Sequence, residues 1–313
     1  MASWSRQLAA RCDGYLAARV AALILPALLL GLASGDERWL KAGMMAVCCL
    51  IAAERSLLGW RAAAGQALSA AAGYLLLATL WRWPWAFALA CAAMAELGCR
   101  LGARQARWRS AANFTFIAAL YLGCEAAAAP GMDPLAALPY LALGGAAAVL
   151  LRGIGGRPGP LPGSASAPGV SPTLGLAALC VGPLAWLAAH YRLPHSQWLV
   201  WSAASVCVGG LAAIRAKCWQ RASGAMLGVP CGVLLGALLP ASAASLMLLG
   251  AGALLSLALF RDYRPAFAAR SALAAAQLTL IGGAAALRLL DVGLAGALVC
   301  LMLALGQWLA GRT

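Results

Sequence analysis

Residues 60–77 read WRAAAGQALSAAAGYLLL and residues 219–236 read WQRASGAMLGVPCGVLLG, so the pattern Trp-x4-Gly-x7-Gly occurs twice, 159 positions apart. At the same offset, Trp39 aligns with Trp198. Matches of Ala and Leu mean little in so Ala-rich a chain, but Trp and Gly at matched spacing are more informative. We therefore predict that the chain consists of two related halves.

The composition is that of a membrane protein. Of the 313 residues, 64% are apolar and only 10% are charged, and the mean hydropathy is +0.84. An ordinary soluble domain has an apolar share nearer half. The formal net charge is +14, but the basic residues lie in small groups between apolar runs, without the basic patch that nucleic-acid binding requires. We predict a lipid bilayer as partner and no nucleic acid.

The apolar runs are long enough to form membrane helices, which need about 20 residues each. Gly, Pro and charged residues divide the chain into twelve candidate spans, of which the second and eighth are the weakest and could be tilted, broken or re-entrant. The twelve candidates are residues 18–34, 39–54, 58–80, 84–101, 110–128, 134–151, 173–190, 197–213, 219–239, 242–260, 267–287 and 292–310.

The distribution of charge predicts the orientation. Loops that stay in the cytoplasm collect Lys and Arg, and most of the 23 basic residues fall on one side if the N-terminus is cytoplasmic. Six spans per half is an even number, so both halves enter from the same side and form a parallel repeat. We predict an all-α protein of about twelve transmembrane helices with both termini cytoplasmic. Residues 1–152 form the first repeat, 153–172 a Gly/Pro/Ser linker in the cytoplasm, and 173–313 the second repeat.

The second half resembles the fusaric acid resistance family, also called aromatic acid exporters. In that family an outward turn precedes a helix that begins with Trp, and a basic turn then leads into a helix with Arg and spaced glycines. The matching residues here are Pro194, His195, Trp198, Arg215, Arg221, Gly224 and Gly228. The first half resembles the family more weakly, through Trp39, Arg55, Arg61, Gly65 and Gly73, and Ser69 replaces the second glycine.

This resemblance implies a multi-pass protein of the bacterial inner membrane that exports aromatic or other organic acids, among them siderophore-like products, with the proton gradient. It implies an organic anion as substrate, with periplasmic adaptor proteins and a second copy of the chain as further candidate partners. Long family members carry a soluble domain after each half. Here only the linker and a short C-terminal end follow, so we expect a short form that lacks those domains.

Four arginines are candidates for binding the substrate. Arg stays charged and can grip a carboxylate through two hydrogen bonds. Arg61 and Arg221 begin the third and ninth spans, where helix N-termini also favour anions. Arg55 and Arg215 lie just before them. Ordinary anchoring of the helix ends by snorkelling side chains is the alternative for each of the four.

Glycines at multiples of four residues favour close packing of helices. Gly65 and Gly73 in the first half, and Gly224, Gly228 and Gly232 in the second, form such stripes. We predict a structural role for them rather than contact with substrate.

Proton coupling requires an ionisable group within or near the membrane. Glu96 lies inside an apolar run, and Glu54 adjoins an arginine with which it could form a local pair. Glu125 lies near the outward end of the fifth span. His190 and His195, the two histidines of the chain, flank the outward turn and suit pH sensing, with a simple interfacial role as the alternative.

The sequence carries no enzyme signature. A P-loop, a nucleophile elbow and metal-ligand spacing are all missing, so we predict no enzyme, no cofactor and no metal site. A passive anion channel and a non-transporting scaffold subunit remain alternatives to a carrier. A ten-helix drug/metabolite transporter agrees less well with the parallel repeat.

Overall fold

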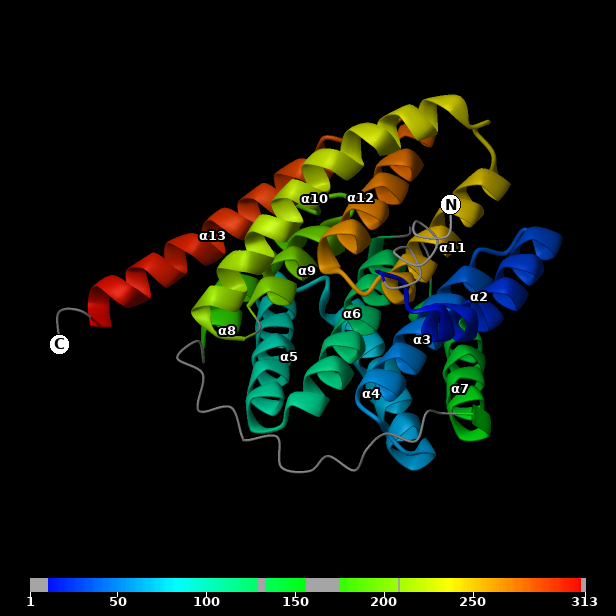
Figure 1. Ribbon diagram of the computed structural model, residues 1–313, viewed down its shortest axis with the longest axis horizontal. Coiled ribbons are helices and arrows are strands. Elements are labelled where there is room, and N and C mark those ends of the chain that lie inside the picture. The colour runs from blue at the N-terminus through cyan, green and yellow to red at the C-terminus, as the bar shows by residue number, and fades with distance from the viewer. Residues whose placement is uncertain (1–10, 129–132, 156–174, 208, 311–313) are drawn as a thin grey trace.

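The computed structural model describes residues 11–128, 133–155, 175–207 and 209–310, which form twelve α-helices and one short 3-10 helix. Figure 1 shows them as a helical bundle. The first half contains α2 (Gly14–Ser34), α3 (Arg38–Arg55), α4 (Trp60–Leu80), α5 (Pro84–Arg104), α6 (Ala106–Ala128), η1 (Pro134–Ala137) and α7 (Leu138–Gly155). The second half contains α8 (Leu176–His190), α9 (Ser196–Val206), α10 (Leu211–Leu238), α11 (Ala243–Leu259), α12 (Tyr263–Leu280) and α13 (Leu287–Ala310).

Residues at the helix ends explain several of these boundaries. Asp13 accepts a hydrogen bond from the backbone N–H of Leu16 and so caps α2. Gly35 follows the same helix with a positive φ of 69°, a conformation that glycine adopts at little cost. Pro84 is the first residue of α5, where its missing N–H costs nothing. The described residues form twelve α-helices, the number predicted, but not all of them have the length and apolarity of a membrane span.

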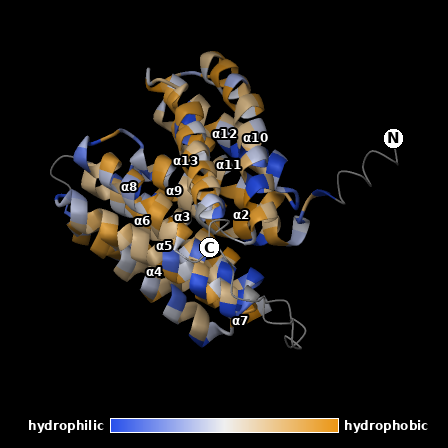
Figure 2. Ribbon diagram, turned by 90° about the vertical axis from the view of Figure 1, so that its left-hand side faces the viewer, coloured by the Kyte–Doolittle hydropathy of each residue, from blue (hydrophilic) through white to orange (hydrophobic). Residues whose placement is uncertain are grey.

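Seven of the helices are long and apolar enough to cross a membrane: α2, α4, α5, α6, α7 (counted with η1), α10 and α13. Figure 2 shows hydrophobic residues along most of the helical surface. Helix α9 has only 11 residues, which span about 16 Å at 1.5 Å per residue, well short of a bilayer core of about 30 Å. The eighth predicted span is therefore a short helix that cannot cross alone.

Two predicted breaks between helices were misplaced, and both errors concern charged residues. The eighth span was expected to reach residue 213, but α9 ends at Val206 and α10 begins at Leu211, after a turn in which Gly209 has a φ of 108°. The predicted basic turn, which includes Arg215, therefore lies inside α10. Similarly, α12 ends at Leu280 and α13 begins at Leu287. Glycines set these breaks, because they leave the helical conformation more readily than Arg or Lys does.

The helices of the two halves pack in corresponding pairs. Within each half the third and fifth helices lie together: α4 on α6, and α10 on α12. Between the halves, the first helix of one packs on the fourth helix of the other, as α2 does on α11 and α8 on α5. Two backbone hydrogen bonds, from Asp13 to Leu259 and from Arg261 to Arg11, also join the start of α2 to the α11–α12 connection.

The predicted linker, residues 153–172, falls almost entirely outside the described residues. Residues 153–155 form the last turn of α7.

Candidate functional site

A cavity of about 1290 Å³ runs between the two halves of the bundle. Residues of α3 and α6 form one wall, and residues of α9, α11 and α12 form much of the other. Its lining includes both Lys41 and Arg55, which lie near opposite ends of α3. Fourteen residues of helix correspond to about 21 Å, so the cavity follows most of the length of this helix.

Basic side chains predominate on the cavity wall. The acidic residues of the lining are Glu37, Glu125 and Asp262. The lysines and arginines are Lys41, Arg55, Arg109, Arg192, Lys217, Arg261, Arg270 and Arg288. The wall therefore attracts anions.

Arg221 lies directly behind this wall and is only 2% exposed. Its guanidinium donates hydrogen bonds to the hydroxyls of Ser205 (2.6 Å), Ser202 (2.8 Å) and Tyr263 (2.9 Å). All three acceptors are hydroxyls, so no carboxylate among them compensates the charge of the guanidinium. Ser205 and Tyr263 themselves line the cavity, so the charge lies one hydroxyl away from its interior.

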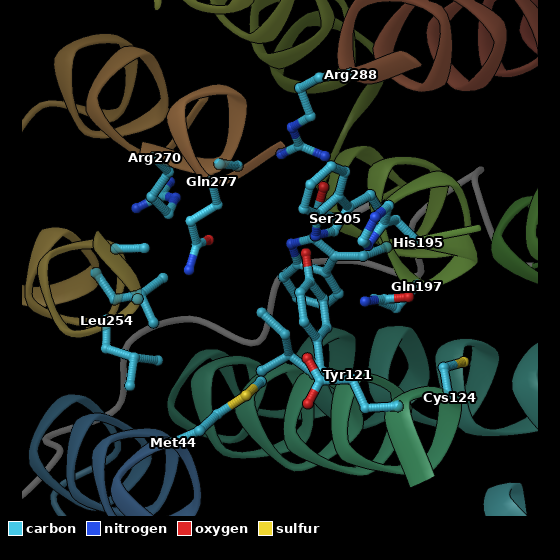
Figure 3. A pocket seen from close by; sticks show the side chains of 18 of the residues that line it. Met44, Tyr121, Cys124, His195, Gln197, Ser205, Leu254, Arg270, Gln277 and Arg288 are labelled. Carbon is cyan, nitrogen blue, oxygen red and sulfur yellow. The ribbon is translucent and has the colours of Figure 1, made fainter. Parts of the chain in front are cut away.

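Arg288 and Arg270 bring two further charges to the same region. Arg288 is 4% exposed, and its Nε and Nη1 atoms are buried without a hydrogen-bond partner. Arg270 donates one hydrogen bond, of 3.3 Å, to the backbone carbonyl of Ser256. In Figure 3, Arg288 extends into the cavity opposite Tyr121 of α6.

The ring of Phe267 holds the three arginines together. The guanidinium carbons of Arg221, Arg288 and Arg270 lie 4.2, 5.3 and 5.9 Å from its centroid. The face of an aromatic ring attracts cations, so Phe267 partly compensates the positive charge. We call Arg221, Arg270 and Arg288 the arginine cluster. Among the ion pairs of the described residues, none involves a member of this cluster.

The structure separates the four arginines predicted to bind substrate. Arg221 belongs to the cluster, and Arg55 lines the cavity, where it donates a hydrogen bond to the carbonyl of Leu257. Arg61 is exposed at the start of α4, next to Trp60, and Arg215 is exposed on α10 and bonded to Gln307. Neither Arg61 nor Arg215 is among the residues that line the cavity.

Two of the predicted proton-coupling carboxylates are engaged elsewhere. Glu54 is buried and pairs with Arg19 and Arg152, each at 3.3 Å, rather than with the adjacent arginine. Glu96 pairs with Arg100 at 2.9 Å and also accepts a hydrogen bond from the N–H of Gly175. These ion pairs and hydrogen bonds indicate that Glu54 and Glu96 have structural roles at helix ends.

The two histidines differ in their surroundings. His190 is exposed at the end of α8 and stacks on Trp186, with ring centroids 4.7 Å apart. His195 precedes α9, stacks on Trp198 and lines the cavity. Burial lowers the pKa of His195, because the charged imidazolium loses hydration there. Glu125 also lines the cavity.

The glycine stripe of α10 faces α12. A Cβ on Gly224 would lie 3.2 Å from the carbonyl oxygen of Arg264. One on Gly228 or Gly232 would overlap the carbonyl oxygen of Ala268 or Ala272. These glycines thus let the two backbones touch.

The glycines of the first half behave differently from each other. A Cβ on Gly73 would lie 2.8 Å from the Cβ of Ala119 on α6, so this position is tightly packed. Gly65 is exposed, with nothing within 4 Å of such an atom.

Residues that the sequence did not single out complete the site. Arg270, Arg288 and Lys217 were counted only as topology signals, and Tyr121 and Phe267 only as apolar residues. These residues come together around one cavity only because their helices pack side by side. The one available signal was Arg270, a charged residue inside the predicted span 267–287.

These features define a multi-pass α-helical membrane protein with a basic internal cavity. Among the described residues, no group of three or more His, Cys, Asp or Glu side chains could hold a metal ion. Residues 180–302 match the model of the fusaric acid resistance protein-like family. The predicted resemblance to that family is thereby confirmed, and it fits a membrane transporter. No curated protein and no solved structure matches the chain.

Proposed function

We propose that the protein is an inner-membrane secondary transporter that exports organic acids, and that the basic cavity is its pathway. The arginine cluster carries this proposal. An arginine in the middle of a membrane protein costs about 2.5 to 3.5 kcal/mol of insertion free energy on the translocon scale, and such residues commonly mark substrate paths. Three of them gathered without a carboxylate partner favour an anion as the missing counter-charge.

The dimensions of the cavity support a pathway rather than a closed pocket. Its lining includes Arg55 and Arg261, which the charge distribution assigns to the cytoplasmic side, and also Arg192 and His195, which it assigns to the outside. Basic residues at both ends and in the middle would give an anion successive sites of similar charge. The match to a transporter family is consistent with this reading.

The two-repeat architecture is part of the proposal. The corresponding helix contacts, α4 with α6 as α10 with α12, and α2 with α11 as α8 with α5, support two parallel six-helix units with both termini cytoplasmic. The arginine cluster belongs to the second unit alone. At the offset of 159 residues, Ala62 and Ala111 of the first unit stand where Arg221 and Arg270 stand in the second, so the two units would contribute unequally to the pathway.

Among the predicted proton-coupling groups, His195 fits best, because it lines the cavity and has no carboxylate partner among the described residues. Glu125, on the opposite wall, is a second group that can exchange a proton with the cavity. Periplasmic adaptor proteins and a second copy of the chain stay proposed partners.

Flux in proteoliposomes tests the function. Labelled aromatic and aliphatic carboxylates are loaded, and their release is followed with and without an imposed pH gradient, using protein-free liposomes as control. Saturable release that depends on the gradient supports a proton-coupled exporter. Release that is indifferent to the gradient would instead support a passive anion channel, and no release of any acid would support a scaffold and overturn the proposal.

A further inference from the structure

We propose that the ligand of the cavity carries at least two negative charges, and that Arg288 binds one of them. This inference rests on the proposed function and names the class of substrate within it. It is argued from the number of charges that face one another in the arginine cluster and from the donors left free there.

Arg288 offers the clearest vacant donors. Its Nε and Nη1 atoms are shielded from water and have no partner, although a buried charged donor ordinarily has one. The nearby rings of Trp198 and Phe267, at 5.0 and 5.3 Å, attract the cation but accept no strong hydrogen bond. The Nε–H and Nη1–H groups leave the guanidinium in different directions, and each can donate a charge-assisted hydrogen bond to an anionic oxygen.

The charge balance of the region requires more than one anionic group. Arg221 donates only to hydroxyls, and Arg270 only to a backbone carbonyl. Lys217 adds a fourth cation, whose Nζ lies 5.5 Å from the ring centroid of Tyr263. A single carboxylate would leave most of this charge uncompensated.

The acids of the lining do not remove this excess. Glu37 is exposed and pairs with Lys41 at 3.0 Å, and Asp262 is exposed at the start of α12. Only Glu125 is partly buried on the cavity wall. Asp291, three residues after Arg288 on α13, is a second carboxylate whose charge acts on Arg288. Three arginines and a lysine against these two carboxylates leave two positive charges, which a dianion, but not a monoanion, can balance.

Binding of a matched series tests the proposal. Benzoate, isophthalate and benzene-1,3,5-tricarboxylate share one ring and differ in charge, and tryptophan fluorescence of the purified full-length chain in nanodiscs reports their dissociation constants. We expect isophthalate to bind at least tenfold more tightly than benzoate. The variant Arg288→Gln should bind isophthalate about tenfold more weakly than the native protein, and its affinity for benzoate should fall much less.

A second variant guards against misfolding of the first. Gln277 lines the cavity and its side chain bonds to the carbonyl of Leu246, so Gln277→Glu adds a negative charge without removing an arginine. Gln277→Glu should weaken the binding of isophthalate more than the binding of benzoate. Equal or tighter binding of benzoate by the native protein would overturn the dianion proposal while leaving anion transport standing. If none of the three acids binds and no carboxylate is transported, both proposals fail.

Discussion

The contact between α10 and α12 permits a quantitative prediction at Gly232. An alanine there would place its Cβ against the carbonyl oxygen of Ala272 and 2.8 Å from both the carbonyl carbon and the Cα of that residue. Carbon atoms normally approach to about 3.5 Å, so the helices must separate by on the order of 0.7 Å. Overpacking of this kind costs about 1 to 3 kcal/mol.

The substitution has an opposing effect that a control can isolate. Replacing a glycine within a helix by alanine gains about 0.5 to 1 kcal/mol. Gly65 is exposed, and a Cβ there meets nothing within 4 Å, so Gly65→Ala should show this gain alone. Gly232→Ala should be the less stable of the two by about 1 to 3 kcal/mol.

Thermal unfolding followed by tryptophan fluorescence, in one detergent for native protein and both variants, measures the difference. We expect the midpoint to fall for Gly232→Ala and to stay or rise for Gly65→Ala. A Gly232→Ala protein as stable as Gly65→Ala would refute the close approach of α10 and α12.

Three further predictions concern single groups. Glu54→Gln removes the carboxylate shared by Arg19 and Arg152 and should destabilise the protein by about 3 to 5 kcal/mol in chemical unfolding. Because burial lowers the pKa of His195, the unfolded chain binds the proton first as pH falls below about 6.5, so stability should decline there; His195→Gln should flatten this part of a melting-against-pH curve. Tyr74→Phe loses a 2.7 Å hydrogen bond to η1 and should cost about 1 kcal/mol, measured by the same unfolding.

The sequence was sufficient for the helices but not for the cavity. Apolar runs and their punctuation predicted twelve helices, and most ends agree with the structure within a few residues. Helix breaks were misplaced where Arg215 and Arg288 were taken as loop residues, because charge alone does not end a helix. The break between α9 and α10 lies instead at Gly209, which has a positive φ.

The partners of individual side chains could not be predicted from the sequence, for a different physical reason. Glu54 meets Arg152 across 98 positions of sequence, and Arg221 meets Tyr263 across 42. Such contacts depend on which helices adjoin, and a periodic apolar pattern does not encode that choice. Arg61 and Arg221 were predicted to bind substrate from the starts of the third and ninth spans, yet Arg61 is exposed and Arg221 is buried.

That contrast provides the most direct test of the central claim, that anions pass through the cavity beside the arginine cluster. Carboxylate flux is measured in proteoliposomes for Arg221→Met and Arg61→Met at matched protein content, with Arg221→Lys included to retain the charge. The account predicts that Arg221→Met loses at least tenfold in flux, that Arg221→Lys retains more, and that Arg61→Met transports like the native protein. Equal flux in Arg221→Met and the native protein, or an equal loss in Arg61→Met, would contradict it.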